Sequence, residues 1–235
     1  MGQKQSKSYT KIYRSWKLGD FFRNFIAVVL GVAITFIGSD RIAERHTQSQ
    51  VKAAMQFVKS ELLLNKERII AMQTNVQTDK LYAEVLIRYE HNLKDAPPDS
   101  IPYRNSRLQQ FAVYTYIYDA LDLLKTSSLV QSVRKPDLVL QILTAYRSIR
   151  EADAGFLLTT QIKREGLQKV YDLPEVRKFD FSQSNAKVWA FLLSLSEGRN
   201  FLMNRINIYS SDTPFQETLD MIDETIAAID KEYAL

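Results

Sequence analysis

Residues 51–76, VKAAMQFVKSELLLNKERIIAMQTNV, decide the fold class, because their apolar residues recur at steps of three and four. Such spacing is typical of one face of an α-helix. The stripe begins before the quoted stretch and ends with it, at Ile42, Val51, Ala54, Phe57, Val58, Leu62, Ile69, Met72 and Val76. Neither proline nor glycine occurs from Ser39 to Ala96. The sequence therefore predicts a long helix, with a break and a new N-cap at Thr78 and Asp79.

The run FIAVVLGVAITFIG at 25–38 precedes this helix, and it contains no charged residue and one polar side chain, that of Thr35. A helix that crosses a bilayer needs about 20 apolar residues, and apolar neighbours on both sides extend the run. We expect a retained transmembrane helix at 21–41 that continues into the long helix, with an anchor formed by Phe25, Val28, Leu30, Val32, Ile34, Phe36 and Ile37. A cleaved signal peptide is the alternative, although its charged leader would be long and no A-x-A type site follows.

The distribution of Lys and Arg predicts the orientation of this anchor. Six basic residues and one acid, Asp20, precede the apolar run, whereas basic and acidic residues alternate after it. The more basic flank of a membrane helix stays in the cytoplasm. We therefore expect a basic cytoplasmic tail at 1–20, an inner (cytoplasmic) membrane location and an extracytoplasmic domain at 42–235.

Composition sets the broad class. The chain has 235 residues, of which 46% are hydrophobic and 25% charged, enough to bury the core of one domain outside the anchor. The absence of cysteine excludes disulfides, thiolate metal sites and a cysteine nucleophile. Much of the net charge of +4 lies in the N-terminal flank, so we expect no nucleic-acid partner.

Apolar periodicity continues beyond the loop DAPPDSIPYRNS at 95–106. A helix is expected from about Ser106 to Ser128, although Tyr and β-branched residues make a short strand at 113–118 the runner-up. Pro136 is expected at the first position of another helix that stops before Pro174. The stripe expected on that helix is Leu138, Ile142, Ala145, Ile149, Phe156, Ile162, Leu167 and Val170.

Two more helices are expected at the C-terminal end, one at 186–211 and one at 213–235. The last begins with a capping box, in which Thr213 is the cap and Gln216 the third helical residue. Its apolar stripe is Phe215, Leu219, Ile222, Ile226, Ile229 and Tyr233. The predicted fold class is all-α: a transmembrane helix that continues into a long helix, then an antiparallel bundle of five or six helices with coiled-coil character.

No catalytic constellation is evident. GxSxG, Walker A, GxGxxG and HExxH motifs are absent, and the chain has only two histidines, His46 and His91. Four carboxylates lie close together on the last helix, but the Glu-x-x-His of a di-metal bundle is missing, so a solvated polar face is expected. This acidic set comprises Glu217, Asp220, Asp223 and Glu224, and its expected contacts are basic residues such as Lys163, Arg164, Lys169, Arg177 and Lys178. We predict no enzyme, no catalytic residue, no metal and no cofactor.

The cluster of tyrosines at 114–118 is the one candidate ligand site. Alternate tyrosines on a helix cover more than one face, so at least one is expected to be exposed. The candidate ligand-binding residues are Tyr114, Tyr118, Asp119 and Asp122. Core packing with the hydroxyls at the rim is the alternative interpretation.

Two stretches resemble a family of bacterial single-pass membrane proteins, a domain of unknown function common in Gram-negative bacteria. They are VVLGVAITFIGSDRIAER and YDALDLLKTSSLVQSVRKPDLVLQILTAYRSI. The chain lacks the family's Asn-Asn-Trp type segment, and Ser127 and Ser128 stand at its Ser-Gly pair. The resemblance covers about half of the chain and implies a membrane-anchored helical domain without an assigned activity.

Two functional hypotheses follow. In the first, the chain is a membrane-anchored scaffold or adaptor of the cell envelope, without enzymatic activity, that binds a protein partner or another copy of itself through its helices. In the second, it is a sensory helical bundle that holds a small molecule near the tyrosine cluster.

Overall fold

The computed structural model describes residues 40–97, 108–208 and 213–235, and its contacts divide the chain into two units, Met1–Gln50 and Val51–Leu235. Within the described residues there are seven α-helices and no strand, so the all-α prediction is confirmed for them. The predicted membrane helix and its seven anchor residues lie outside the described residues, apart from positions 40 and 41. None of the described helices combines the length and the hydropathy that a bilayer crossing requires.

The first described helix, α2, extends without interruption over Asp40–Arg88. The predicted break at Thr78 and Asp79 is therefore wrong. The Thr78 hydroxyl donates to the carbonyl oxygen of Thr74 at 2.6 Å, a bond that leaves the helix intact. The Asp79 side chain is buried and forms an ion pair with Lys163. A polar residue that looks like a helix start is thus a buried partner of a distant lysine.

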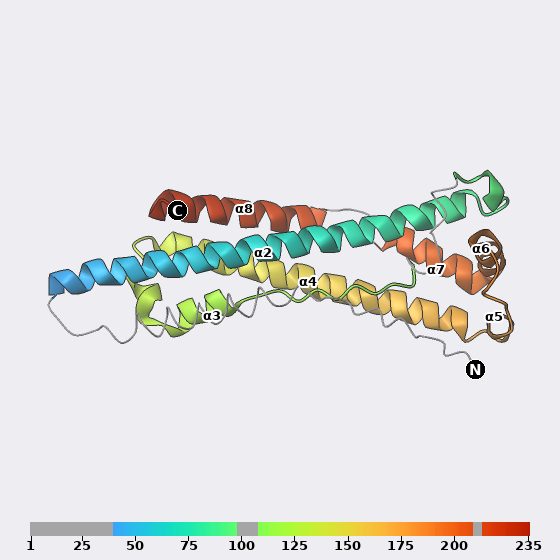
Figure 1. Ribbon diagram of the computed structural model, residues 1–235, viewed down its shortest axis with the longest axis horizontal. Coiled ribbons are helices and arrows are strands. Elements are labelled where there is room, and N and C mark those ends of the chain that lie inside the picture. Colours follow the sequence, from blue (N-terminus) through green and yellow to red (C-terminus); the bar gives the residue numbers. More distant parts are fainter. Residues whose placement is uncertain (1–39, 98–107, 209–212) are drawn as a thin grey trace, which may run out of the picture. The chain divides into compact units, whose positions relative to one another are not determined.

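In the second unit, α2 and the C-terminal helix α8 (Thr213–Tyr233) run side by side in opposite directions (Figure 1). Lys59 lies 2.5 Å from Asp230, and Lys66 lies 2.6 Å from Asp223, so residue numbers rise on one helix as they fall on the other. The apolar stripe predicted for α8 packs into the core, where Ile222 and Ile229 are fully buried.

Helix α4 (Pro136–Tyr171) begins at the predicted proline. It runs parallel to α2, because Glu61 contacts Tyr146 and Asp79 contacts Lys163 farther along both helices (Figure 1). The prediction of an antiparallel bundle is therefore wrong for this pair. Two consecutive long helices can be parallel only if the connection between them travels back along their length.

The connection that returns along α2 is extended. Residues 110–118 form neither helix nor strand, and α3 begins only at Asp119 and ends at Thr126, followed by the 3-10 helix η3 (Ser128–Ser132). The exposure of 111–116 alternates from one residue to the next, as in an extended chain. The helix predicted from Ser106 is thus wrong for 110–118 and correct only for α3.

Side chains of α2 hold this extended segment in place. The Asn65 side chain donates to the Ile117 carbonyl oxygen at 2.7 Å and accepts from the Ile117 N–H at 2.8 Å. Arg68 donates to the carbonyl oxygen of Thr115. Because backbone polar groups away from water need partners, these bonds replace those that a helix would have supplied.

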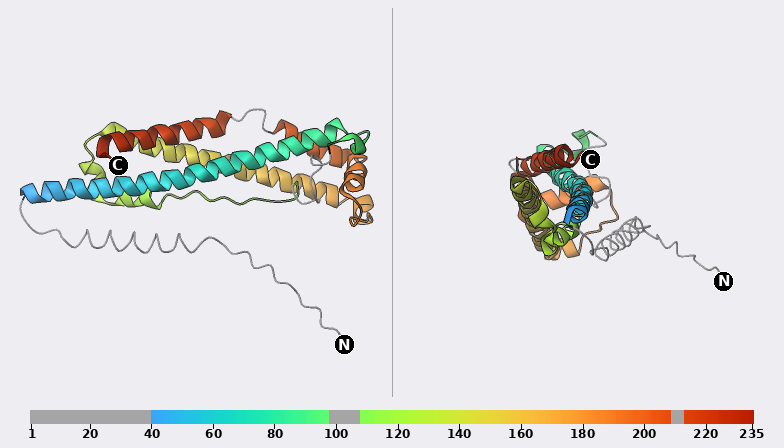
Figure 2. Two further views of the ribbon diagram at one scale, coloured as in Figure 1. Left: turned by 45° about the horizontal axis from the view of Figure 1, so that its top comes forward. Right: turned by 90° about the vertical axis from the view of Figure 1, so that its left-hand side faces the viewer.

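The far end of the second unit consists of short helices (Figure 2). They are η1 (Leu93–Asp95), α5 (Pro174–Arg177), α6 (Asn185–Leu193) and α7 (Ser196–Asn207). The single helix predicted at 186–211 is wrong, because the chain turns between α6 and α7. A Cβ at Gly198 would lie 2.0 Å from the Leu192 carbonyl oxygen, so the turn needs glycine at this position.

Apolar residues gather in two clusters along the second unit. One joins α2, α3, α4 and α8, and the other joins the end of α2 with the end of α4 and with α5, α6 and α7. On α2 the first cluster ends at Val76 and the second begins at Ala83, with Asp79 between them. On α4 the corresponding interval contains Lys163. The Asp79–Lys163 ion pair therefore lies between two apolar cores.

Candidate functional site

A hollow of about 400 Å³ opens beside α3 and α4, and its volume is in the range of ligand sites. We name it the α3–α4 groove. It is lined by Tyr116, Tyr118, Leu121, Asp122, Lys125, Leu143, Tyr146, Arg147 and Arg150. The extended segment and α3 supply one wall, and one flank of α4 supplies the other.

The floor of the groove is anchored by a buried carboxylate. Glu61 accepts a hydrogen bond from the Ala120 N–H at 2.8 Å, which satisfies one of the free donors at the start of α3. It also accepts a hydrogen bond from the hydroxyl of Tyr146. Burial raises the pKa of Glu61, although both hydrogen bonds act in the opposite direction. Burial likewise raises the pKa of Tyr146 well above its ordinary value, so this phenol stays protonated and donates.

Positive charge predominates around the groove. Lys125, Arg147 and Arg150 face one acid, Asp122, whose carboxylate lies 4.0 Å from Lys125. Both arginines are exposed, and neither forms an ion pair or a hydrogen bond with the described residues. Because they are three residues apart on α4, their side chains are neighbours. Each guanidinium group is planar and can bind a carboxylate through two parallel hydrogen bonds.

The structure brings two of the four predicted ligand residues into this groove, namely Tyr118 and Asp122. The other two lie elsewhere. The Tyr114 ring packs edge-on against Phe156 with a centroid distance of 5.3 Å, which agrees with the core-packing interpretation for this residue. Asp119 is exposed at the first position of α3 and is not part of the lining.

Sequence reasoning missed the α4 wall of the groove. Arg147 and Arg150 lie 29 and 32 residues beyond Tyr118, and α4 brings them to the cluster after the chain turns through η3. Their signal in the sequence is weak, because two arginines on the polar side of an amphipathic helix are also typical of a solvated face.

A second polar site lies between the two apolar cores. Lys163 Nζ is 2.5 Å from Asp79 Oδ2 and donates to the Gln110 carbonyl oxygen at 2.8 Å. Arg205 is buried nearby and donates to the Thr159 carbonyl oxygen at 3.4 Å. The adjoining cavity has a volume of about 20 Å³, enough for one water molecule. This site therefore suits a structural ion pair and is too small for an organic ligand.

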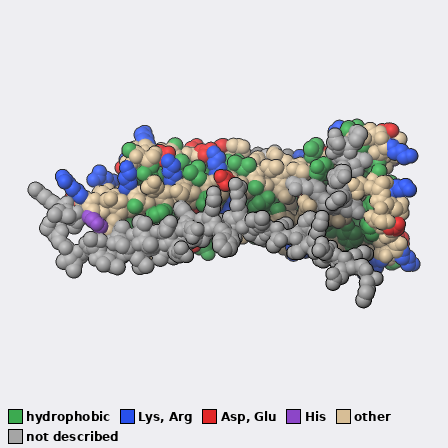
Figure 3. Space-filling view, viewed as in Figure 1, with side chains coloured by type: hydrophobic (Ala, Val, Ile, Leu, Met, Phe, Trp, Pro, Cys, Tyr) green, Lys and Arg blue, Asp and Glu red, His purple; other side chains and the backbone are tan. Residues whose placement is uncertain are grey.

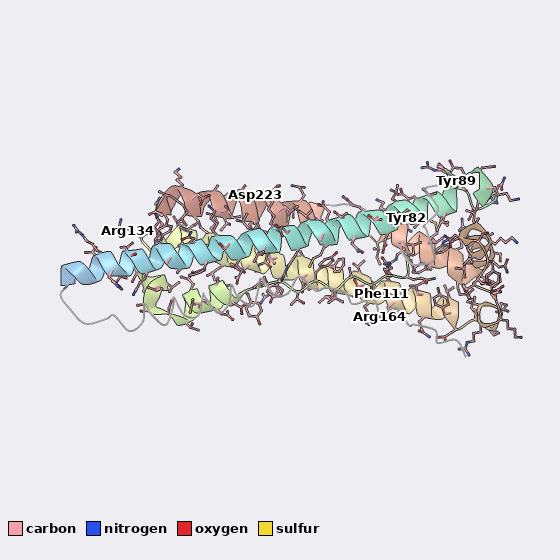
Figure 4. All side chains as sticks on the ribbon, in the orientation of Figure 1. Tyr82, Tyr89, Phe111, Arg134, Arg164 and Asp223 are labelled. Carbon is pink, nitrogen blue, oxygen red and sulfur yellow. The ribbon has the colours of Figure 1, made fainter. Side chains whose placement is uncertain are left out.

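Phe111 covers the outer side of this ion pair. Its ring lies 5.6 Å from Lys163 Nζ and 5.2 Å from the Arg164 guanidinium carbon, and Figure 4 shows Phe111 and Arg164 next to each other. Lys163, which the sequence suggested as basic surface, is buried, whereas Arg164 is exposed. Within the described residues, no group of three or more His, Asp or Glu side chains is placed to hold a metal ion.

No family model matches the chain, and no curated protein or solved structure shows significant similarity to it. The α3–α4 groove is thus the candidate site on the strength of its geometry alone.

Proposed function

We propose that this chain is a membrane-anchored helical adaptor, without enzymatic activity, that binds a protein partner through α4 and the extended segment beside it. The observation that carries the proposal is exposed apolar surface. Of the ten large apolar side chains exposed within the described residues, seven belong to these two elements. We call them the α4 face: Phe111, Val113, Tyr118, Leu140, Leu143, Leu157 and Leu158.

The α4 face has the composition of an interaction surface. Exposed apolar side chains that gather in one region commonly mark binding sites, and Leu140 and Leu158 are 62% and 58% exposed. Arg147 and Arg150 lie on the same flank of the helix. Figure 3 shows one side of the described residues, where apolar side chains occur between Lys, Arg and acidic residues. Apolar contacts with a charged rim are typical of protein interfaces.

The membrane part of the proposal rests on the sequence. The apolar run at 25–38 and its basic flank support an anchor with the N-terminus in the cytoplasm and the helical domain outside it. A reporter fused to the C-terminus and carbonate extraction of membranes test this arrangement. An active cytoplasmic reporter or a protein released by carbonate would reject it.

Photo-crosslinking tests the interaction surface. A photoreactive amino acid placed at Leu143 or Leu158 of the full chain is expected to yield one discrete adduct in cells. Leu81 on α2 is the matched control, because it is an apolar residue of similar exposure, 57%, outside the α4 face. Equal adducts at all three positions, or none, would reject the proposal. An adduct of twice the chain mass would identify the partner as a second copy.

The α3–α4 groove also supports a second candidate function, a sensory bundle that binds a small molecule. The specific observation is the volume of about 400 Å³ lined by Tyr118 and Asp122. A small molecule that binds the folded state must raise the melting temperature, and the stabilisation grows with the logarithm of the ratio of its concentration to its Kd. A thermal-shift screen of small organic acids against the full chain in detergent distinguishes this function from the adaptor.

A further inference from the structure

The extended segment has two backbone edges, and α2 occupies only one. The bonds from Asn65 and Arg68 reach Ile117 and Thr115, which are both odd-numbered. In an extended chain, the N–H and C=O groups of successive residues point to opposite edges. The groups of the even-numbered residues therefore point away from α2 and toward α4. The Gln110 carbonyl agrees with this assignment, because it accepts from Lys163 of α4.

The second backbone edge of the extended segment reaches the groove at Tyr116. This residue lines the α3–α4 groove between Thr115, whose carbonyl oxygen accepts from α2, and Ile117, whose N–H and carbonyl both bond to α2. The N–H and C=O of Tyr116 form no hydrogen bond with the described residues. An extended backbone with free donors and acceptors is a template on which another extended chain can pair.

The charges of the groove specify which chain would pair there. Among the lining residues three cations face one anion, and the two arginines on α4 lack ion-pair partners among the described residues. Residues i and i+2 of a strand lie about 7 Å apart on the same face, and neighbours at i and i+3 on a helix are about 5–6 Å apart. Two acidic side chains on one face of an added strand would therefore match Arg147 and Arg150.

We infer that the α3–α4 groove binds an extended acidic segment of a partner protein, which pairs its backbone with Tyr116 and places alternate carboxylates on Arg147 and Arg150. The inference rests on the proposed adaptor function, since it names the chemistry of the partner. Tyr118 and Leu143 supply apolar contacts for the side chains near the groove wall.

Fluorescence anisotropy with defined peptides tests this inference on the full chain in detergent. The probe is a fluorescein-labelled octapeptide of alternating glutamate and valine. We expect saturable binding that weakens at least tenfold in the double variant Arg147→Glu, Arg150→Glu. The matched control, Lys178→Glu with Lys187→Glu, makes the same change in net charge at exposed sites outside the groove and is expected to leave the affinity within twofold.

A second pair of probes separates backbone pairing from charge alone. Two peptides are N-methylated on alternate peptide bonds, one along each backbone edge, which removes donors without changing the charge. The peptide whose methylated edge faces Tyr116 is expected to bind at least fivefold more weakly than the other. The peptide with lysine in place of glutamate is expected not to bind.

Four results would overturn the inference. The first is no saturable binding at millimolar peptide, and the second is equal affinity of the peptide for the natural protein and the double arginine variant. The third is equal affinity of the two N-methylated peptides. The fourth is displacement of the labelled peptide by glutarate at the same concentration as by unlabelled peptide. The last would indicate a small-anion site. If the peptides fail while Leu143 and Leu158 still give specific crosslinks, the adaptor proposal stands and the strand-addition inference is rejected.

Discussion

Helix α8 and the segment 110–118 both lie in stretches that the sequence predicts to be helical, yet only α8 is a helix. Helix α8 satisfies its own backbone, and its apolar stripe provides the contact with the core. The segment 110–118 instead has its backbone bonded by side chains of α2 and α4. The difference shows that local periodicity predicts structure only where no distant polar group competes for the backbone.

Proline substitution should separate the two regions most strongly. At Ala227, an exposed position inside α8, proline removes a helix hydrogen bond and clashes with the preceding turn, which costs about 3 kcal/mol or more. At Val113, which is 75% exposed, extended backbone accommodates proline, and we expect a loss of about 1 kcal/mol or less. Urea denaturation of both variants, followed by far-UV circular dichroism, measures the difference. Equal losses would contradict the extended conformation.

Removal of the asparagine that binds the segment should have the next largest effect. Asn65→Ala leaves the N–H and C=O of Ile117 without their partners, and we expect a loss of about 2–3 kcal/mol in the free energy of unfolding. Asn65→Asp keeps an acceptor for the N–H, but it buries a carboxylate whose second oxygen faces the Ile117 carbonyl oxygen, so its loss near neutral pH should be at least as large as that of Asn65→Ala.

Hydrogen exchange provides the control for this prediction. The amide of Ile117 should lose protection in Asn65→Ala while the amide of Ile222 in α8 keeps it. Loss of protection at both amides to the same extent would indicate global destabilisation and contradict a local role for Asn65.

The smallest effect is expected from Glu61, the buried carboxyl of α2 that accepts a hydrogen bond from the start of α3. Because burial raises the pKa of Glu61 in the folded state, the folded protein binds a proton more tightly than the unfolded chain does. The stability that this proton contributes is present below the unfolded pKa and is lost as pH rises through the folded pKa. Glu61→Gln resembles the protonated form, so its stability relative to the natural protein should increase with pH over that interval. Parallel urea titrations at several pH values measure this slope, and a slope of opposite sign would contradict the prediction.

The predictable part of the fold is the part with local causes. The start of α4 at Pro136 follows from proline geometry, and the apolar stripe of α8 follows from its spacing. Both are confirmed, with Ile226 and Tyr233 of that stripe only partly buried. The capping box at Thr213 remains a prediction, because the side chain of this residue lies outside the described residues. The predictions fail where polar residues interrupt the apolar faces. The helix start predicted at Asp79 is wrong, and the core position predicted at Ile162 is occupied by Lys163.

The α3–α4 groove was only half predictable for the same reason. Tyr118 and Asp122 belong to one continuous stretch with an unusual composition. The chain returns along α2 through this stretch, and α4 then runs back past it with Arg147 and Arg150. A sequence signal for this return did exist, since Glu61 and Asn65 stand one helical turn apart on the apolar side of α2 and are both buried. Two polar residues on a core-facing stripe indicate that a backbone without its own partners lies opposite.

The alternating exposure of 111–116 makes this segment sensitive to parity. A single-residue insertion in a helix rotates the following side chains by about 100°, whereas the same insertion in an extended chain reverses inside and outside for all that follow. One residue inserted next to Val113 would exchange the exposed and the partly buried side chains on one side of the insertion, whereas two inserted residues would restore the original alternation. Length variation in homologous chains should therefore occur here in steps of two.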